Sequence, residues 1–310
     1  MSALMSPSTS HSPSAAKLNG IFTALITPFS KGEIDWVSLQ KLLRQQIDGG
    51  VQGIVVCGTT GETPTLTLEE RKKLFEFIRS EVSGAVQLVM GTGSNSTHET
   101  MVATRAAKEW GAIAALVVVP YYNKPSQKGL VAHFTKVAVE GELPVILYNV
   151  PSRTITALEL ESIQALAKVP GVVAIKEATG NLEFGRQISK TTHLMLASGD
   201  DASCMNLVGS GSRGVISVIS HLIPKEMTTL FKRAVANEAP GEIEAVASEW
   251  ASRFGALNRD LYVEANPIPL KYALHKMGII SSPELRLPLT ELDVKYRAVV
   301  DQAMKAGGLL

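Results

Sequence analysis

The sequence predicts a (β/α)₈ barrel with a C-terminal helical appendage. Eight short apolar segments are separated by longer amphipathic stretches, at intervals of about 20 to 35 residues, which is typical of repeated βα units. The segments are apolar throughout rather than alternating, as expected for parallel strands buried on both faces. A length of 310 residues suits one α/β barrel with additions. An open doubly wound sheet is the alternative fold.

The expected strands comprise residues 21–26, 53–57, 86–91, 114–119, 145–149, 172–176, 194–197 and 214–218. Two helix starts carry the pattern of a capping box, Thr67 with Glu70 and Thr156 with Glu159, in which two side chains satisfy free amides at a helix end. These boxes predict helices after the second and the fifth strand.

Changes in composition divide the chain into three parts. Residues 1–17 are rich in Ser and Pro and lack the apolar stretch of a signal peptide, which predicts a disordered tail. Residues 18–236 form the expected barrel. Residues 237–310 are broken at 240–241 (PG), 266–269 (NPIP) and 281–283 (SSP), which predicts about three further helices. These helices either cover the barrel or make oligomer contacts.

Charge and hydropathy exclude several classes of protein. The 30 basic and 29 acidic side chains give a net charge of +1, so no broad field attracts a nucleic acid or an anionic membrane. The longest apolar run, residues 112–119, is far shorter than the ~18 residues of a spanning helix. Cys57 and Cys204 match no metal or redox spacing, so we interpret them as buried thiols of a cytoplasmic protein.

The active site of a barrel lies at the C-terminal ends of its strands. Lys176 ends the sixth expected strand, where a desolvated amine that has lost its proton can attack a carbonyl and form a Schiff base. The alternative for this position is an ion pair between Lys176 and Glu177 at the surface. Tyr148 and Arg153 follow from the fifth strand; a phenol can relay protons, and a guanidinium can bind a carboxylate through two hydrogen bonds.

Other strand ends carry further polar groups. Residues 58–62 (GTTGE) form a turn whose amides and hydroxyls can hold a small carboxylate, or a tight turn with only local bonds. Residues 120–125 (PYYNKP) present two tyrosines, suited to an interface or to packing over the barrel. Gly199 allows the backbone to approach a ligand closely, whereas Asp200 and Asp201 are interpreted as caps of the next helix.

Two remaining patterns carry no site. Residues 91–95 (GTGSN) lack the lysine of a P-loop and the third glycine of a dinucleotide fingerprint. The six histidines show no spacing suited to zinc. The sequence therefore predicts neither a metal nor a cofactor.

From about residue 20 to its C-terminus, the chain resembles the pyruvate-dependent class I aldolase family of dihydrodipicolinate synthase and N-acetylneuraminate lyase. The segments that carry the resemblance are 58–62 (GTTGE), 120–123 (PYYN), 148–154 (YNVPSRT), 175–180 (IKEATG), 198–201 (SGDD), 214–217 (GVIS) and 266–269 (NPIP). Within this family, Thr59–Thr60 and Arg153 resemble the lysine-pathway branch, which condenses pyruvate with aspartate semialdehyde.

The resemblance implies a role for each of eight residues. Lys176 forms the imine with pyruvate, and Tyr148, Thr59 and Tyr122 relay protons, Tyr122 reaching in from a neighbouring subunit of a dimer or a dimer of dimers. The implied binding groups are the backbone of Thr59 and Thr60 for the pyruvate carboxylate, Arg153 for the carboxylate of the aldehyde, and Gly199 and Ile216 beside the imine.

Three positions depart from the family's pattern. Lysine-inhibited members have histidines where this chain has Leu68 and Arg71, so we predict weak or no inhibition by lysine. Ile155 stands where the family often has glycine, in the expected entrance loop. Two other functions remain open: an aldolase for a 2-keto-3-deoxy sugar acid or N-acetylneuraminate, against which Arg153 argues, and a barrel that binds a keto acid without converting it.

Overall fold

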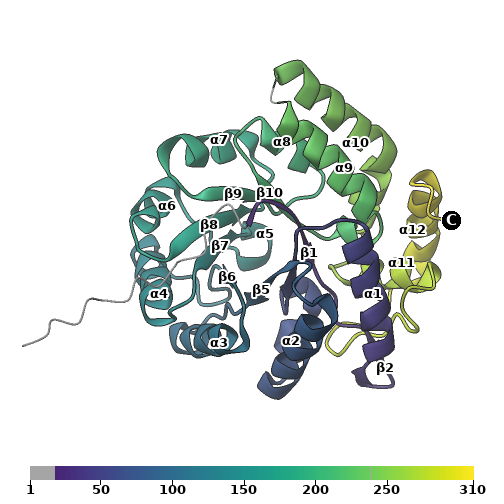
Figure 1. Ribbon diagram of the computed structural model, residues 1–310, viewed down its shortest axis with the longest axis horizontal. Coiled ribbons are helices and arrows are strands. Elements are labelled where there is room, and N and C mark those ends of the chain that lie inside the picture. Colours follow the sequence, from purple (N-terminus) through teal and green to yellow (C-terminus); the bar gives the residue numbers. More distant parts are fainter. Residues whose placement is uncertain (1–17, 238) are drawn as a thin grey trace, which may run out of the picture.

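The predicted barrel is confirmed. The computed structural model describes residues 18–237 and 239–310, and in it eight parallel strands close in the order β1-β10-β9-β8-β7-β6-β5-β4. Figure 1 shows these strands at the centre of the molecule with helices around them. The closed ring excludes the open doubly wound sheet. The predicted tail, residues 1–17, lies outside the described residues.

All eight predicted strands are present, with ends within two residues of the prediction. They are β1 (Gly20–Ala24), β4 (Gly53–Val56), β5 (Gln87–Gly91), β6 (Ala114–Val118), β7 (Val145–Asn149), β8 (Val172–Glu177), β9 (Met195–Ser198) and β10 (Gly214–Ser217).

Helices follow each barrel strand. They are α1 (Trp36–Asp48), α2 (Leu68–Val82), α3 (Thr97–Trp110), α4 (Gln127–Glu140), α5 (Pro151–Thr154), α6 (Leu160–Ala167), α7 (Leu182–Thr191), α8 (Cys204–Val208) and α9 (Pro224–Ala236). Short 3₁₀ turns are η2 (Thr59–Gly61), η3 (Thr63–Thr65) and η4 (Ile219–His221). After α9 come α10 (Pro240–Asp260), α11 (Ile268–Lys276) and α12 (Val294–Ala306), the three further helices that the sequence predicts.

One predicted helix start is confirmed and the other is wrong. Thr67 and Glu70 form the capping box of α2. Thr156 caps nothing: α6 begins at Leu160, and the amide of its N-cap residue Glu159 donates to the Gln127 side chain at 3.2 Å. This tertiary hydrogen bond replaces the local one that the pattern predicts.

A hairpin of two-residue strands, β2 (Phe29–Ser30) and β3 (Glu33–Ile34), lies between β1 and α1 and is absent from the prediction. Its two-residue loop has φ values of 55° at Lys31 and 84° at Gly32. Such loops match the twist of the flanking strands. Strands of two residues are too short to show an alternation of apolar and polar residues in the sequence.

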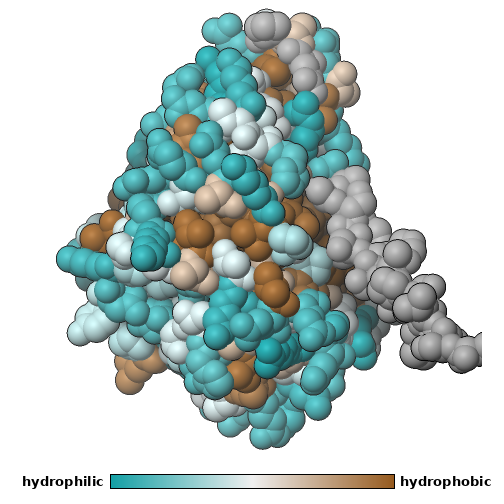
Figure 2. Space-filling view, turned by 90° about the vertical axis from the view of Figure 1, so that its left-hand side faces the viewer, coloured by the Kyte–Doolittle hydropathy of each residue, from teal (hydrophilic) through white to brown (hydrophobic). Residues whose placement is uncertain are grey.

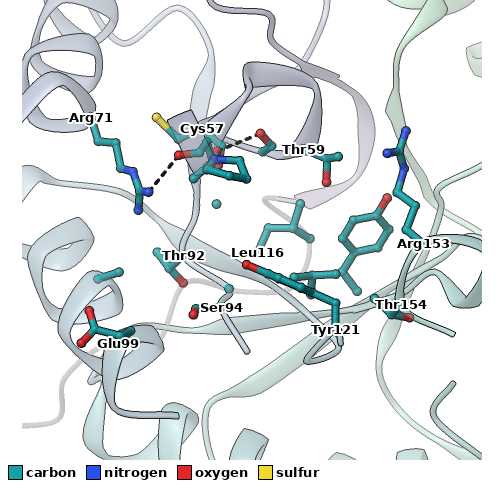
Figure 3. Close-up of a pocket in the computed structure, with 18 of the residues that line it drawn as sticks. Cys57, Thr59, Arg71, Thr92, Ser94, Glu99, Leu116, Tyr121, Arg153 and Thr154 are labelled. Atoms are coloured by element: carbon teal, nitrogen blue, oxygen red, sulfur yellow. Dashed lines mark hydrogen bonds between the residues drawn. The ribbon is translucent and has the colours of Figure 1, made fainter. Parts of the chain in front are cut away.

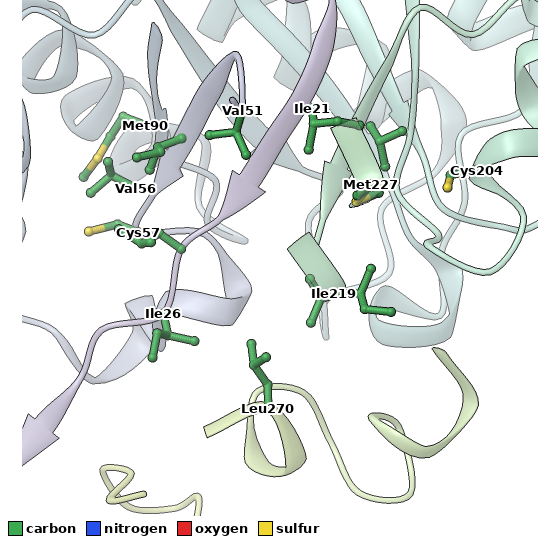
Figure 4. Close-up of a cluster of buried hydrophobic side chains, with 14 of the residues drawn as sticks. Ile21, Ile26, Val51, Val56, Cys57, Met90, Cys204, Ile219, Met227 and Leu270 are labelled. Carbon is green, nitrogen blue, oxygen red and sulfur yellow. The ribbon is translucent and has the colours of Figure 1, made fainter. Parts of the chain in front are cut away.

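Alternation of side chains divides the apolar core into two layers. Along β7, Ile146 and Tyr148 belong to the cluster inside the barrel, whereas Val145 and Leu147 belong to the larger cluster between strands and helices. Figure 4 shows part of this outer cluster. Both layers are apolar, which explains the unbroken apolar runs in the sequence.

Figure 2 shows the face at the left of Figure 1, near α4, α6 and α7, with hydrophobic residues at its centre and hydrophilic residues around them.

The buried residues include two cysteines and a histidine with shifted pKa values. Cys57 and Cys204 are free and buried, and burial raises the pKa of the Cys57 thiol to about 12. His221 is fully buried; its Nε2 accepts from the Ile26 amide at 3.1 Å and its Nδ1 contacts the Val218 carbonyl oxygen at 2.7 Å. Burial lowers the pKa of His221 to about 4.

We expect the protein to lose stability as the pH falls below about 6.5. An unfolded His221 takes up a proton near pH 6.5, whereas the folded imidazole takes one up only near its pKa of about 4, so the unfolded state binds more protons between these values. The loss from this residue amounts to at most about 3 kcal/mol near pH 4. Urea unfolding from pH 7.5 to 4.5 measures it. His221→Gln should flatten the profile, and a slope unchanged in that variant would contradict the prediction; the exposed His98→Gln is the control.

Within residues 18–237 and 239–310, no helix combines the length and the apolar character needed to cross a membrane.

Candidate active site

The alternation of β7 and β8 turns Tyr148 and Lys176 into the barrel. Tyr148 follows Ile146 at a spacing of two and Lys176 follows Ala174 likewise, and both apolar residues lie in the inner cluster. Tyr148 and Lys176 pair directly across the two parallel strands. The Lys176 Nζ lies 4.2 Å from the centre of the Tyr148 ring, and both side chains are buried. An amine and a phenol thus share one enclosed space.

The next residue of each strand points outward and fixes the pair. Asn149 and Glu177 also pair across β7 and β8, and the Asn149 amide donates to the Glu177 carboxylate at 2.9 Å. Glu177 accepts a second hydrogen bond from the Thr179 amide at 2.6 Å, while burial raises the pKa of its carboxyl. The alternative of a surface ion pair between Lys176 and Glu177 is therefore wrong, because the two side chains point to opposite faces of the strand.

A cavity of about 440 Å³ opens above these residues at the C-terminal ends of the strands. We call it the mouth cavity. Six of the eight residues singled out from the sequence line it: Thr59, Thr60, Tyr148, Arg153, Lys176 and Gly199.

Gly199 is required by the lysine beside it. A Cβ atom at this position would lie 2.8 Å from the Lys176 Cε and 2.7 Å from the Ala178 Cβ, closer than real Cβ contacts allow. Any larger residue would push the Lys176 side chain from its place in the mouth cavity.

The turn after β4 brings Thr59 and Thr60 to the cavity wall. It is the 3₁₀ turn η2, closed by Glu62 in the left-handed conformation at φ 56°. The Thr60 hydroxyl accepts from the side-chain amide of Asn266 at 2.9 Å. This partner lies 206 residues away in the chain, so the threonine does not serve a purely local turn.

Arg153 lies on α5, one short turn of helix after β7. Its guanidinium donates to the Asn266 carbonyl oxygen at 3.3 Å, and its side chain lines the mouth cavity. Ile155, directly after α5, is 73% exposed and has a φ of 64°. A β-branched residue is strained there, which gives a physical reason for glycine at this position.

The two aspartates after β9 differ from the prediction that both cap α8. Asp200 accepts from the Ser203 amide at 2.9 Å, in the turn before α8. Asp201 is buried and accepts from the amides of Val218 and Ile219 at 2.8 and 2.9 Å. Asp201 therefore joins the ends of β9 and β10, because its carboxylate accepts from the free amides after β10 instead of those of α8.

Two of the eight residues do not line the mouth cavity. Ile216 belongs to the apolar cluster inside the barrel, and Val218, two residues further, lines the cavity from the same strand end. Tyr122 is 88% exposed at φ 76°, on the loop between β6 and α4. Its phenol is not part of the site within one described chain.

The sequence prediction also missed cavity residues on the C-terminal side. Tyr262, Glu264 and Asn266 line the mouth cavity from the segment between α10 and α11. None of them follows a strand, so the strand-end rule does not find them, although 266–269 is among the segments of the family resemblance. This segment shows that the C-terminal region covers the barrel.

A second cavity of about 480 Å³ adjoins the first and shares Thr59, Tyr148 and Arg153 with it. We call it the side cavity. Figure 3 shows Arg71 and Glu99 on one side of it and Tyr121 across its front. The Arg71 guanidinium donates to the carbonyl oxygens of Leu66 and Thr63 at 3.1 and 2.8 Å.

The fold and the site define a class. A barrel with a buried lysine beside a tyrosine at its mouth is typical of class I aldolases, which bind carbonyl substrates as imines. Within residues 18–237 and 239–310, no group of three or more His, Cys, Asp or Glu side chains is placed to hold a metal ion.

The comparisons with known proteins give the family. Residues 17–307 match the model of the dihydrodipicolinate synthetase family. The chain is 50% identical over 293 residues to the 4-hydroxy-tetrahydrodipicolinate synthase of Bdellovibrio bacteriovorus, covering 94% of this chain and 98% of the relative. The chain belongs to the dihydrodipicolinate synthetase family and is an enzyme, a lyase.

Solved structures of dihydrodipicolinate synthases support the same family assignment. The dihydrodipicolinate synthase of Acinetobacter baumannii complexed with pyruvate has 39% sequence identity and a TM-score of 0.89, covering 94% of this chain and 100% of that one. The enzyme of Cyanidioschyzon merolae with lysine bound has 40% identity and a TM-score of 0.88, covering 95% and 99%.

Proposed function

We propose that the protein condenses pyruvate with L-aspartate-4-semialdehyde to 4-hydroxy-tetrahydrodipicolinate. The observation that carries this proposal is the group formed by Lys176, Tyr148 and Arg153 around one cavity. The name of the Bdellovibrio relative and the pyruvate bound to the Acinetobacter enzyme support it. Arg153 favours this reaction over the sugar-acid aldolases, because its guanidinium lines the same cavity as Lys176 and can bind the carboxylate of a short substrate through two hydrogen bonds.

The proposed reaction begins at Lys176. Its amine attacks the ketone carbon of pyruvate, and loss of water leaves an imine that draws electrons from the methyl group. A methyl proton leaves through the relay of Tyr148, Thr59 and Tyr122, and the resulting enamine carbon attacks the aldehyde. The amine of the second substrate then closes the ring by attacking the imine carbon, which releases Lys176.

The binding roles are those that the family resemblance implies, and the placement of the cavity's polar groups supports them. The Thr59–Thr60 turn would hold the pyruvate carboxylate and Arg153 the carboxylate of the aldehyde, while Gly199 leaves room for the imine. Ile216 would lie beneath the imine, in the apolar cluster inside the barrel. No cofactor enters the reaction.

The test is a coupled assay with purified protein, pyruvate and aspartate semialdehyde, in which added dihydrodipicolinate reductase consumes NADPH. We expect steady consumption that depends on both substrates. If borohydride traps pyruvate on the protein but no NADPH is consumed, the protein is instead an aldolase for a sugar acid or N-acetylneuraminate. Absence of both would leave a barrel that binds a keto acid.

We further propose that Tyr122 completes the mouth cavity of a second copy in a dimer or a dimer of dimers. Its exposure and its left-handed backbone hold the phenol away from its own barrel. Tyr122→Phe should lower kcat while leaving the unfolding temperature unchanged, because the side chain packs against little in its own chain. An unchanged kcat would refute the role.

Mixing an impaired variant with an inactive one tests whether Tyr122 crosses to the partner subunit. Dimers formed from Tyr122→Phe and Lys176→Ala chains contain one site with both residues intact. Co-expression should therefore restore up to about a quarter of wild-type activity if subunits pair at random. No recovery in verified mixed dimers would place Tyr122 outside the partner's site.

Weak or absent binding of lysine is a separate expectation. In the side cavity the ammonium of a lysine ligand would meet the positive charge of Arg71 and the apolar Leu68. Arg71 is held in place by its two carbonyl partners, so it cannot turn away without losing them. Calorimetric titration should show no micromolar binding, and a micromolar Kd would overturn the expectation.

We also propose that the enzyme works in the cytoplasm and that its chain divides at residue 236 into a barrel and a C-terminal helical region. The two free, buried cysteines support the location. The end of α9 at Ala236 supports the boundary.

A further inference from the structure

The segment between α10 and α11 contacts the proposed substrate-binding residues through one side chain. Asn266 is buried and lines the mouth cavity. Its side-chain amide donates to the Thr60 hydroxyl at 2.9 Å, and its backbone oxygen accepts from the Arg153 guanidinium at 3.3 Å. One residue thus holds the two groups to which we assign the two substrate carboxylates.

The direction of the first hydrogen bond has a chemical consequence. A hydroxyl has one proton and two acceptor positions. Because Asn266 occupies an acceptor position of Thr60, the hydroxyl proton stays free to donate elsewhere. Thr60 lines the cavity, so a substrate carboxylate is a suitable acceptor for that proton.

The segment that carries Asn266 is itself fixed to the threonine turn. Lys271 on α11 forms an ion pair with Glu62, and both side chains are fully buried. The same Glu62 carboxylate accepts from the Arg286 amide at 3.0 Å, and Lys271 donates to the Glu284 carbonyl oxygen at 2.9 Å. Glu62 closes the turn of Thr59 and Thr60, so these contacts set the distance between Asn266 and Thr60.

We propose that Asn266 is a positioning residue for pyruvate binding, acting through the Thr60 hydroxyl. Without the amide, the hydroxyl rotates freely or donates to another acceptor, and the substrate carboxylate loses a preorganised donor. The proposal rests on the proposed function, because it takes pyruvate as the ligand of this turn.

The test measures imine formation alone, without the second substrate. Borohydride trapping is followed by intact mass over a series of pyruvate concentrations, which gives the half-saturating concentration. Asn266→Ala should raise this concentration about tenfold, the effect of one lost hydrogen bond to a charged group. Thr60→Val should raise it as well, and the double variant should be no worse than Thr60→Val alone.

Each other outcome overturns the proposal. A half-saturating concentration within about twofold of wild type in Asn266→Ala, or effects that add in the double variant, would show that Asn266 does not act through Thr60. Failure of the wild type to be trapped would refute the proposed function and the inference with it. If Asn266→Ala does not fold, Asn266→Asp replaces it in the test. The carboxylate of this variant would accept the Thr60 hydroxyl proton and draw it away from the cavity, so the half-saturating pyruvate concentration should rise as well.

Asn258 provides the matched control. It is also buried in the C-terminal region, on α10, and its amide has no hydrogen-bond partner in the described chain. Asn258→Ala should leave the half-saturating pyruvate concentration unchanged. A general loosening of the C-terminal region would raise that concentration in both variants, whereas loss of the Thr60 contact would raise it only in Asn266→Ala.

Discussion

Lys176→Ala should abolish trapping by pyruvate and borohydride and lower the condensation rate by at least about 10³-fold. No other amine is placed to replace it, because Lys176 is the only lysine among the described residues that line the mouth cavity, and Arg153 carries a guanidinium instead of an amine. The effect should fall on kcat, because the covalent intermediate cannot form. The coupled assay and intact mass after trapping measure the two losses.

The control for this variant is Lys225→Ala, which removes an exposed lysine at the start of α9. It should leave both measurements unchanged. Residual trapping in Lys176→Ala would mean that another amine forms the imine. Loss of turnover with trapping intact would make Lys176 a group that binds or polarises the substrate rather than the nucleophile.

The sequence predicts the strands and the position of Lys176 because both depend on local patterns. An apolar run long enough for a buried strand, followed by a polar residue, identifies the barrel mouth without knowledge of distant contacts. Lys176 and Tyr148 are found in this way, and alternation then turns both inward. The hairpin of Phe29–Ser30 and Glu33–Ile34 escapes because its strands are too short for a pattern.

The remaining differences arise from long-range hydrogen bonds. The backbone amide of Glu159 donates to the Gln127 side chain, and the Asp201 carboxylate accepts from an amide after β10. Asn266 reaches Thr60 from the far end of the chain. Each of these hydrogen bonds joins two groups that become neighbours only when the barrel closes, so a local rule assigns the residue to the wrong partner or to none.

Lys271→Met should destabilise the protein by about 3–5 kcal/mol, the effect of leaving one charge of a buried ion pair without its partner. Burial lowers the pKa of Lys271 to about 8, so the ammonium keeps its charge at neutral pH, and Glu62 is fully buried against it. Lys271 also lies 4.3 Å from the centre of the Phe29 ring, which links the hairpin to α11. Urea unfolding followed by circular dichroism measures the loss.

The double variant Lys271→Met with Glu62→Gln separates the ion pair from the packing around it. Removing both charges leaves no uncompensated carboxylate, so this variant should recover at least half of the stability that Lys271→Met loses. If the double variant is as unstable as the single one, the loss arises from the contacts of the Lys271 Nζ with the Phe29 ring and the Glu284 carbonyl oxygen, and the charge of Glu62 is not the cause. The exposed pair of Lys73 and Glu69 on α2 is the control, since Lys73→Met should leave the stability nearly unchanged.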